Sequence, residues 1–212
     1  MEVRKSSLHQ VADICRKYWT NISPPSTLSS DRPSAVPAEI GTALRDFDLI
    51  EEVGNGATGI VYRARSRLDG RTYALKRVST RHVRAETLRE VRMLKRCCAH
   101  PGILQFYGFF VATEEQELVI VTEFAEGGDL ERFVKRHIDE RRRVAERDIW
   151  GLAWQLALGL LHLHARSVIH RDVKPLNILL FGQTTAKLGD LGESVLYDRS
   201  RALSGILLSQ EA

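Results

Sequence analysis

Apolar and polar positions between residues 47 and 124 alternate in short runs, which is typical of antiparallel strands separated by tight turns. Glycines and acidic turns divide this stretch into five predicted strands, at residues 47–54, 59–65, 72–78, 103–112 and 117–124. Between the third and fourth strands the period lengthens, because Leu88, Val91 and Leu94 recur at every third position. This spacing predicts a helix over residues 87–96.

From Gly127 onward the pattern becomes helical. Asp129 follows the breaker pair Gly127-Gly128 and is a good N-cap, so we expect a helix over residues 129–137. A longer helix is predicted over residues 147–165, with one apolar face formed by Ile149, Leu152, Ala153, Leu156, Leu160 and Leu163. Short strands are expected at residues 178–181 and 186–188. A strand-rich lobe with one helix, followed by a helix-rich lobe, predicts an α+β fold.

The first part of the chain has a different composition. Residues 1–20 have the spacing of a short amphipathic helix, and residues 22–38 are rich in serine and proline. A serine- and proline-rich stretch buries too little apolar surface to offset chain entropy, so we expect a flexible linker there. The sequence therefore divides into an N-terminal extension, residues 1–45, and one folded domain, residues 46–212.

Composition excludes several classes of protein. Hydrophobic residues make up 43% of the chain and charged residues 27%, as in ordinary globular proteins. No apolar run approaches the roughly 20 residues of a transmembrane helix. Charged residues interrupt the N-terminus, which argues against a secretory signal. The three cysteines form no disulfide framework, so we expect a cytoplasmic or nuclear protein with reduced thiols.

Two local clusters of residues could suggest ligands. Cys97, Cys98 and His100 have no evident fourth ligand, so we interpret the cysteines as small buried side chains rather than as zinc ligands. Basic residues gather in one stretch, at Arg132, Lys135, Arg136, Arg141, Arg142, Arg143 and Arg147. No DNA-binding motif or aromatic platform accompanies them, so we expect a solvated helix face rather than a nucleic-acid site, with docking of an acidic partner as the alternative.

The first motif that carries chemistry is a glycine-rich turn. The pattern G-x-G-x-x-G-x-V is fitted by Gly54, Asn55, Gly56, Ala57, Thr58, Gly59, Ile60 and Val61. Glycines let the backbone bend tightly and bring N–H donors close to phosphate oxygens. The same spacing marks a dinucleotide-binding Rossmann fold when a helix follows it. Here a predicted strand follows, so we expect a phosphate-binding hairpin instead.

A lysine on the third predicted strand is the next candidate. Lys76 can neutralise phosphate oxygens of a nucleotide, and the small Ala74 leaves room above an adenine ring. The flexible arm of a lysine needs a carboxylate to hold it. Glu90 on the following predicted helix is our choice, and Glu86, one turn earlier, is the alternative.

The most specific signal is the stretch from His170 to Asn177, which matches H-R-D-x-K-P-x-N. Phosphoryl transfer uses such side chains: Asp172 can accept the hydrogen of a substrate hydroxyl, and Lys174 can balance charge on the transferred group. Asn177 can offer an amide oxygen to Mg²⁺, whereas we interpret His170 as structural. Asp190, which begins the sequence Asp-Leu-Gly, is the carboxylate expected to bind the same cation.

These motifs, in this order from Phe47 to Gly192, resemble those of the protein kinase family. Residues 123–130, the catalytic stretch and residues 187–192 are similar to the NIMA-related serine/threonine kinases. The resemblance implies a protein kinase-like two-lobe fold, ATP and Mg²⁺ as cofactors, and a protein serine or threonine as substrate.

The resemblance also implies roles around the base and sugar. Thr122 looks like the gatekeeper, and the backbones of Glu123 and Ala125 resemble the hinge that hydrogen-bonds adenine. Asp129 resembles the residue that contacts the ribose. The apolar side chains that would enclose the base are Val61, Ala74 and Leu179.

The resemblance to the protein kinase family becomes weaker after Gly192. The family continues there through an activation segment, an A-P-E motif and further helices, whereas 20 residues remain in this sequence. Residues 204–212 resemble a shortened version of the stretch that leads into A-P-E, with Gln210 where proline is expected. We therefore expect a complete β-rich N-lobe, an incomplete helical C-lobe, and apolar surface on residues 147–165 that is partly uncovered.

Two functions stay open at this point. One is an active serine/threonine kinase, because no catalytic position is lost. The other is a non-catalytic, truncated kinase-like module that binds ATP or a protein partner. We expect any activating phosphate on Ser194, Tyr197, Ser200 or Ser204, where it would pair with Arg171. An ordinary polar loop is the alternative for this segment.

Overall fold

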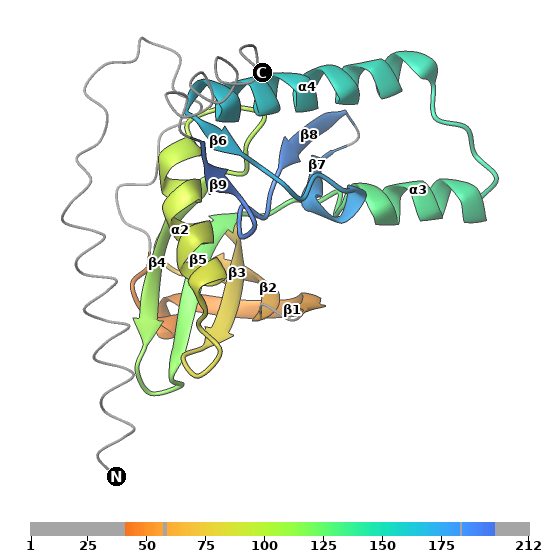
Figure 1. Ribbon diagram of the computed structural model, residues 1–212. Helices are drawn as coiled ribbons and strands as arrows, with labels where there is room; N and C mark the ends of the chain where they lie inside the picture. The colour runs from red at the N-terminus through yellow and green to blue at the C-terminus, as the bar shows by residue number, and fades with distance from the viewer. Residues whose placement is uncertain (1–40, 57–58, 183, 198–212) are drawn as a thin grey trace, which may run out of the picture.

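The structure is a computed structural model that describes residues 41–56, 59–182 and 184–197. A short 3-10 turn, Leu44–Asp46, leads into a five-stranded antiparallel sheet with the order β1-β2-β3-β5-β4 (Figure 1). The strands of this sheet are β1 (Phe47–Gly56), β2 (Gly59–Ser66), β3 (Thr72–Ser79), β4 (Phe106–Ala112) and β5 (Glu117–Glu123). All five expected strands are therefore present, and the predicted α+β fold is confirmed.

The described residues form three α-helices, of which α2 (Ala85–Cys97) lies against the sheet beside β4 and β5, whereas α3 (Leu130–Asp139) and α4 (Glu146–Ala165) lie beyond it (Figure 1). Asp129 caps α3 as expected, because its Oδ1 accepts a hydrogen bond of 2.8 Å from the Arg132 N–H. The helical pattern of the sequence thus located all three helices to within two residues at their ends.

A second layer of short strands lies between the sheet and α4 (Figure 1). A 3-10 turn over Pro175–Asn177 leads into β7 (Ile178–Phe181), which pairs with β8 (Thr185–Leu188). Two further strands, β6 (Val168–Ile169) and β9 (Val195–Leu196), pair with each other. The sequence did not predict β6 and β9, because two residues are too few to carry a periodic signal.

One predicted boundary is wrong. The expected strand over residues 103–112 begins only at Phe106, because the residues before it pair with β8. Leu104 N–H donates to Leu188 O over 2.9 Å, and Leu188 N–H donates to Gly102 O over 2.9 Å. Ile103 and Leu104 are apolar because they are buried, and this made them look like part of a strand in the sequence. They instead join the lower layer to the edge of the main sheet.

The apolar core surrounds both faces of the main sheet. On one face, Val91 and Leu94 of α2 pack with Leu188 and Leu191 in the larger cluster, which extends to α4. On the other face, a smaller cluster is built around Phe47, whose ring stacks on that of Phe110 at 6.1 Å. Burial on both faces explains why the middle of β5 is continuously apolar rather than alternating.

Helix α4 has an apolar face that nothing in the described part of the chain covers. Trp150 and Trp154 are each 67% exposed, and Leu161 is 63% exposed. Their spacing places them on one side of the helix. The expected uncovered surface on α4 is therefore present. The predicted inward face was only partly correct, because Leu152 and Leu163 are buried whereas Ile149 is 53% exposed.

The C-terminal end of α2 is bound to α4 through a histidine. His162 Nε2 lies 3.0 Å from Cys97 O, and Arg166 Nη1 lies 3.0 Å from His162 Nδ1. The rings of His100 and His162 stack at 4.3 Å. Cys97 is buried, as expected, and no group of metal-binding side chains occurs among the described residues. Burial, helped by the charge of Arg166, lowers the pKa of His162 to about 4.

Substitution of Gly159 tests the close contact between α4 and the loop before β4. A Cβ there would lie 2.7 Å from Gly102 O, so Gly159→Ala forces the helix and loop apart. We expect a loss of roughly 1–3 kcal/mol in unfolding free energy, measured by denaturant titration. Gly151→Ala in the same helix meets nothing within 4 Å and should stabilise. Equal effects of the two substitutions would contradict the contact.

Lowering the pH tests the histidine junction. The ordinary pKa of histidine is 6.5, whereas His162 stays neutral in the fold down to about 4. Between these values the unfolded chain binds more protons, so stability falls as pH falls from 6.5 to 4. His162→Gln keeps a donor for Cys97 O but does not titrate. We expect a shallower dependence of unfolding free energy on pH in this variant, and an unchanged slope would exclude His162 as its source.

Candidate active site

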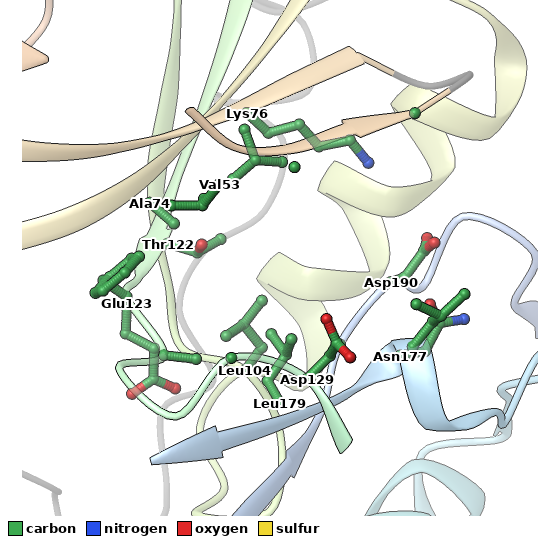
Figure 2. A pocket seen from close by; sticks show the side chains of 18 of the residues that line it. Val53, Ala74, Lys76, Leu104, Thr122, Glu123, Asp129, Asn177, Leu179 and Asp190 are labelled. Carbon is green, nitrogen blue, oxygen red and sulfur yellow. The ribbon is translucent and has the colours of Figure 1, made fainter. Parts of the chain in front are cut away.

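A cleft of about 760 Å³ opens between the main sheet and the lower layer. Figure 2 shows side chains from both layers around it, with Lys76 above and Asn177 and Asp190 below. Of the residues predicted to bind nucleotide or metal, those that line the cleft are Gly54, Asn55, Gly56, Gly59, Val61, Ala74, Lys76, Glu90, Glu123, Ala125, Asp129, Asn177, Leu179 and Asp190. Ala57 and Thr58 lie outside the described residues.

The roof of the cleft is the hairpin of β1 and β2. Gly54 pairs with Val61, and Gly56 pairs with Gly59, so the glycine-rich turn joins two antiparallel strands. A strand rather than a helix follows the glycines, which excludes the Rossmann alternative. Gly59 has a φ of +130°, and a Cβ there would lie 2.5 Å from Arg77 O, so only glycine fits.

Lys76 of β3 is held by a carboxylate from α2. Lys76 Nζ lies 2.7 Å from Glu90 Oε2, so Glu90 rather than Glu86 is the partner of the lysine. The two side chains are only 15% and 9% exposed. Burial raises the pKa of the Glu90 carboxyl, the charge of Lys76 opposes this, and the nearby Asp190 carboxylate adds to it. The pair fixes the ammonium group within the cleft.

Asp172 lies in the turn that precedes β7 and adjoins the cleft through Asn177, which lines it. Its Oδ2 accepts hydrogen bonds from Lys174 Nζ at 2.6 Å and from Asn177 Nδ2 at 2.9 Å. The hydrogen bond from Lys174 is the main cause that lowers the pKa of Asp172. Burial opposes it, and the hydrogen bond from Asn177 adds to the lowering. The contact with Asp172 raises the pKa of Lys174. No described group hydrogen-bonds Oδ1 of Asp172, which leaves an ionised oxygen able to accept a proton.

His170 is buried beneath this turn. Its Nε2 lies 3.0 Å from Gly189 O, and its Nδ1 accepts a hydrogen bond from the Asp172 N–H at 3.3 Å. Only 1% of the residue is exposed. Both ring nitrogens are engaged with the backbone, so the imidazole is a spacer between two loops. This agrees with its interpretation as a structural residue.

Asp190 and Asn177 place two side-chain oxygens that could bind a cation on the floor of the cleft. Both amide hydrogens of Asn177 are directed at Asp172, to its backbone O and its Oδ2, which leaves the amide oxygen available to a cation. A carboxylate and an amide oxygen suit the hard ion Mg²⁺. No group of three or more His, Cys, Asp or Glu side chains that could hold a metal ion occurs in the described ranges.

The back of the cleft is formed by the segment after β5. Thr122 is buried, and the Glu123 carboxylate is held by Lys187 Nζ at 2.6 and 2.7 Å and by the Gln105 N–H at 2.6 Å. The Ala125 carbonyl accepts a hydrogen bond from Gly128 N–H at 3.1 Å. The side chain of Glu123 is therefore used within the structure and not left free for a ligand.

Several residues that line the cleft were missed from the sequence. Val53 and Leu104 extend its apolar walls (Figure 2). Arg132, whose side chain is 64% exposed at the mouth of the cleft, donates to Val53 O at 3.0 Å. Val53 is the unpaired residue of a bulge in β1, and its position just before the glycines could have identified it. Leu104 and Arg132 gave no such signal, because each comes from a distant part of the chain.

One of the expected phosphorylation positions is wrong. Ser194 is fully buried, and its hydroxyl donates to Leu191 O at 2.5 Å. A phosphate could not be accommodated there without unpacking the loop. Tyr197 is 41% exposed, whereas Ser200 and Ser204 lie outside the described residues.

Comparison with known proteins identifies relatives. A family model described as protein kinase domain matches residues 47–210. Misshapen-like kinase 1 of Rattus norvegicus is 36% identical over 167 residues, which cover 74% of this chain and 12% of that protein. Mitogen-activated protein kinase kinase 7 of Arabidopsis thaliana is 32% identical over 163 residues, which cover 76% of this chain and 50% of that protein.

The expected likeness to the NIMA-related kinases is also found. Human serine/threonine-protein kinase Nek2 is 31% identical over 156 residues, which cover 69% of this chain and 35% of Nek2. The identities to these three relatives differ little. The chain spans half or less of the length of each of them.

Removing Lys187 tests the bonds behind the cleft. Lys187→Met leaves the Glu123 carboxylate, which is 16% exposed, with only one donor. We expect a loss of roughly 2–4 kcal/mol in unfolding free energy, measured by denaturant titration. Adding Glu123→Gln to this variant should recover much of the loss, because the buried charge is then gone.

The matched control is an exposed ion pair. Arg142 and Glu140 are paired at 3.2 Å with side chains 70% and 44% exposed. Arg142→Met should change stability by less than about 1 kcal/mol. A loss from Lys187→Met no greater than that from Arg142→Met would contradict a structural role for Glu123.

Proposed function

Because this chain belongs to the protein kinase family, we propose that it transfers the γ-phosphate of ATP to serine or threonine hydroxyls of a protein. The observation that carries this proposal is the convergence of Lys76, Asp172 and Asp190 around one cleft although they are far apart in the sequence. Each supplies a group that phosphoryl transfer uses: a cation for phosphates, a proton acceptor and a metal ligand.

The proposal gives ATP one orientation in the cleft. The adenine ring would lie between the apolar side chains of Val61, Ala74 and Leu179 and meet the backbone of Glu123 and Ala125. The phosphates would lie beneath the glycines of the hairpin, whose N–H groups suit them. Lys76, held by Glu90 at 2.7 Å, would neutralise the phosphate oxygens. Asp129 would meet the ribose, since it lines the cleft beside Arg132.

The metal ion would be held by Asp190 and Asn177. Mg²⁺ held there would supply positive charge that offsets the negative charge that builds up on the transferred group. The contribution of the protein is to keep the Asn177 amide oxygen free, by using its amide hydrogens on Asp172.

Asp172 orients the attacking hydroxyl. Its free Oδ1 accepts the hydrogen bond of a serine or threonine hydroxyl and aims the oxygen at the γ-phosphorus. A new O–P bond forms as the bond from the γ-phosphorus to the β–γ bridging oxygen breaks, and the hydroxyl proton passes to the carboxylate or to the transferred phosphate. Lys174, at 2.6 Å from Asp172, keeps this carboxylate ionised and offsets charge on the transferred group.

Serine or threonine rather than tyrosine is proposed as the acceptor on two grounds. The Lys174-Pro175 pair after Asp172 is similar to the serine/threonine class. The printed names of Nek2 and Nek5 describe those relatives as serine/threonine-protein kinases.

Phosphotransfer by the purified chain tests the proposal. We expect Mg²⁺-dependent transfer of labelled γ-phosphate to a general protein acceptor such as casein. Asp172→Asn should lower kcat by roughly 10²–10⁴-fold, because the proton acceptor is lost while the shape is kept. Asp190→Ala should abolish the Mg²⁺-dependent transfer.

The matched control is Asp139→Asn at the exposed end of α3, which should leave transfer unchanged. Equal transfer by the unaltered chain and by Asp190→Ala would contradict a kinase activity of this site. Mg²⁺-dependent binding of ATP without transfer would favour the non-catalytic binding module instead.

A further inference from the structure

Helix α4 is as apolar on the side that faces away from the core as on the side that faces it. No Asp, Glu, Lys or Arg occurs in residues 149–165. Leu152 and Leu163 are buried on the inner side, whereas Trp150 and Trp154 on the other side are each 67% exposed. A helix that is apolar all round is normally covered on all sides. The outer side of α4 is open to solvent in the described part of the chain, so it is suited to a further partner.

The exposed apolar residues of α4 form one continuous stripe, which we call the outer face. They recur every three or four positions, a spacing that places them along one side of a helix. The two indoles alone expose about 300 Å², and the aliphatic side chains bring the total to roughly 500 Å². An apolar patch of this size marks an interaction site. The members of the outer face are Ile149, Trp150, Ala153, Trp154, Ala157, Leu158, Leu161 and Ala165.

A second copy of this chain matches the outer face in area and in chemistry. Two outer faces in contact would bury about 1,000 Å², the area at which specific protein interfaces begin. A two-fold dimer uses the same surface patch on both copies, so a patch without charges can pair with itself. A charged partner, by contrast, would find no opposite charge along the middle of this face.

The two ends of the outer face favour an antiparallel arrangement of the helices. Glu146, at the N-terminal end, accepts a hydrogen bond of 3.2 Å from Trp150 Nε1. His164, at the C-terminal end, is exposed on the same side of α4. An antiparallel copy brings its own His164 to Trp150 and Glu146, and it sets the N-terminus of each helix dipole beside the C-terminus of the other. A parallel copy would place two Glu146 carboxylates side by side.

The middle of the outer face allows the two helices to approach closely. Ala157 lies midway between Trp150 and His164, so antiparallel pairing places it at the two-fold axis, opposite Ala157 of the second copy. Its methyl group leaves room at the axis. Trp154 then lies against Leu161 of the second copy, so the bulky indoles fill the space on either side of the axis and do not collide.

We propose that two copies of this chain associate through the outer faces of α4, packed antiparallel about a two-fold axis at Ala157. Helix α4 lies on the far side of β7 and β8 from the main sheet (Figure 1), and none of its residues lines the cleft. The association is therefore independent of the proposed phosphotransfer, and either can fail without the other.

Sedimentation equilibrium of the full chain tests the association. We expect a reversible monomer–dimer equilibrium with a dissociation constant in the micromolar range, because the buried area is at the low end for specific complexes. Leu161→Glu puts a charge into the contact and should raise this constant at least about tenfold. A chain that stays monomeric at about 100 µM, or that forms a broad series of aggregates without a discrete dimer, would overturn the proposal.

The matched control is an exposed aliphatic residue outside the outer face. Ile138 of α3 is 69% exposed, compared with 63% for Leu161. Ile138→Glu makes the same chemical change at a similar exposure and should leave the dissociation constant unaltered. Equal effects of the two substitutions would mean that exposed apolar surface in general, rather than α4, drives the association.

Disulfide cross-linking tests the antiparallel orientation. In a chain with Cys15→Ser, Ala157→Cys places two thiols together at the axis, and mild oxidation should give a covalent dimer. Ala165→Cys is the control on the same face, because antiparallel packing separates its two copies by about 24 Å along the helix axis. Cross-linking of Ala165→Cys as efficient as that of Ala157→Cys would reject the antiparallel arrangement.

Reversal of the end charges gives a second test of orientation. Glu146 and His164 are about 27 Å apart within one helix, so they cannot interact in a single copy. His164→Glu should weaken the dimer several-fold, because the new carboxylate meets Glu146 of the second copy. Adding Glu146→Lys should restore association. A double variant as weak as His164→Glu alone would reject this contact.

Tryptophan fluorescence distinguishes a second copy from other occupants of the outer face. Trp19→Phe leaves Trp150 and Trp154 as the emitting residues. We expect their shielding from acrylamide to increase with protein concentration. Shielding at every concentration in a monomer would assign the outer face to residues 1–20 of the same chain, and shielding only with phosphatidylcholine vesicles would assign it to a lipid surface. Either result would reject the dimer.

Discussion

The hydrogen bonds of Leu188 to the backbone of Gly102 and Leu104 join the two layers of this molecule, and the cleft lies between the layers that they hold together. The segment that begins at the end of β8, residues 187–192, makes the other connections. Lys187 binds Glu123 behind the cleft, Gly189 meets the turn that carries Asp172, and Gly192 meets α2. One short segment thus fixes the distance between the roof and the floor.

The chemistry of the cleft depends on how differently its three carboxylates are surrounded. Asp172 lies near the surface, where hydrogen bonds from Lys174 and Asn177 lower its pKa and keep it ionised. Glu90 is buried, so desolvation raises its pKa, and the charge of Lys76 opposes that effect. One carboxylate thereby stays ionised near the surface, while the other is committed to an ion pair. Asp190 is positioned by the backbone hydrogen bonds of the glycines on its two sides.

Many elements of the fold and of the site could be predicted from the sequence, because they depend on residues that are close together in the chain. The glycine spacing predicted the hairpin of β1 and β2, and the cap at Asp129 located α3. Glu90 could be preferred over Glu86 from its place on the helix. The bonds from Glu123 to Lys187 and from Arg89 to Gly192 could not be predicted, because they join residues 64 and 103 positions apart. Burial of Ser194 was missed for the same reason, since its sequence context is that of a polar loop.

Two contacts that connect the roof of the cleft to its floor differ in how well they are shielded from water. Behind the cleft, Lys187 and Glu123 are 17% and 16% exposed, and Glu123 also accepts from the Gln105 N–H. At the mouth, the side chain of Arg132 is 64% exposed where it reaches Val53 O. Water competes with the exposed contact far more than with the buried one. The connection between roof and floor is therefore better shielded from water at Glu123 than at Arg132.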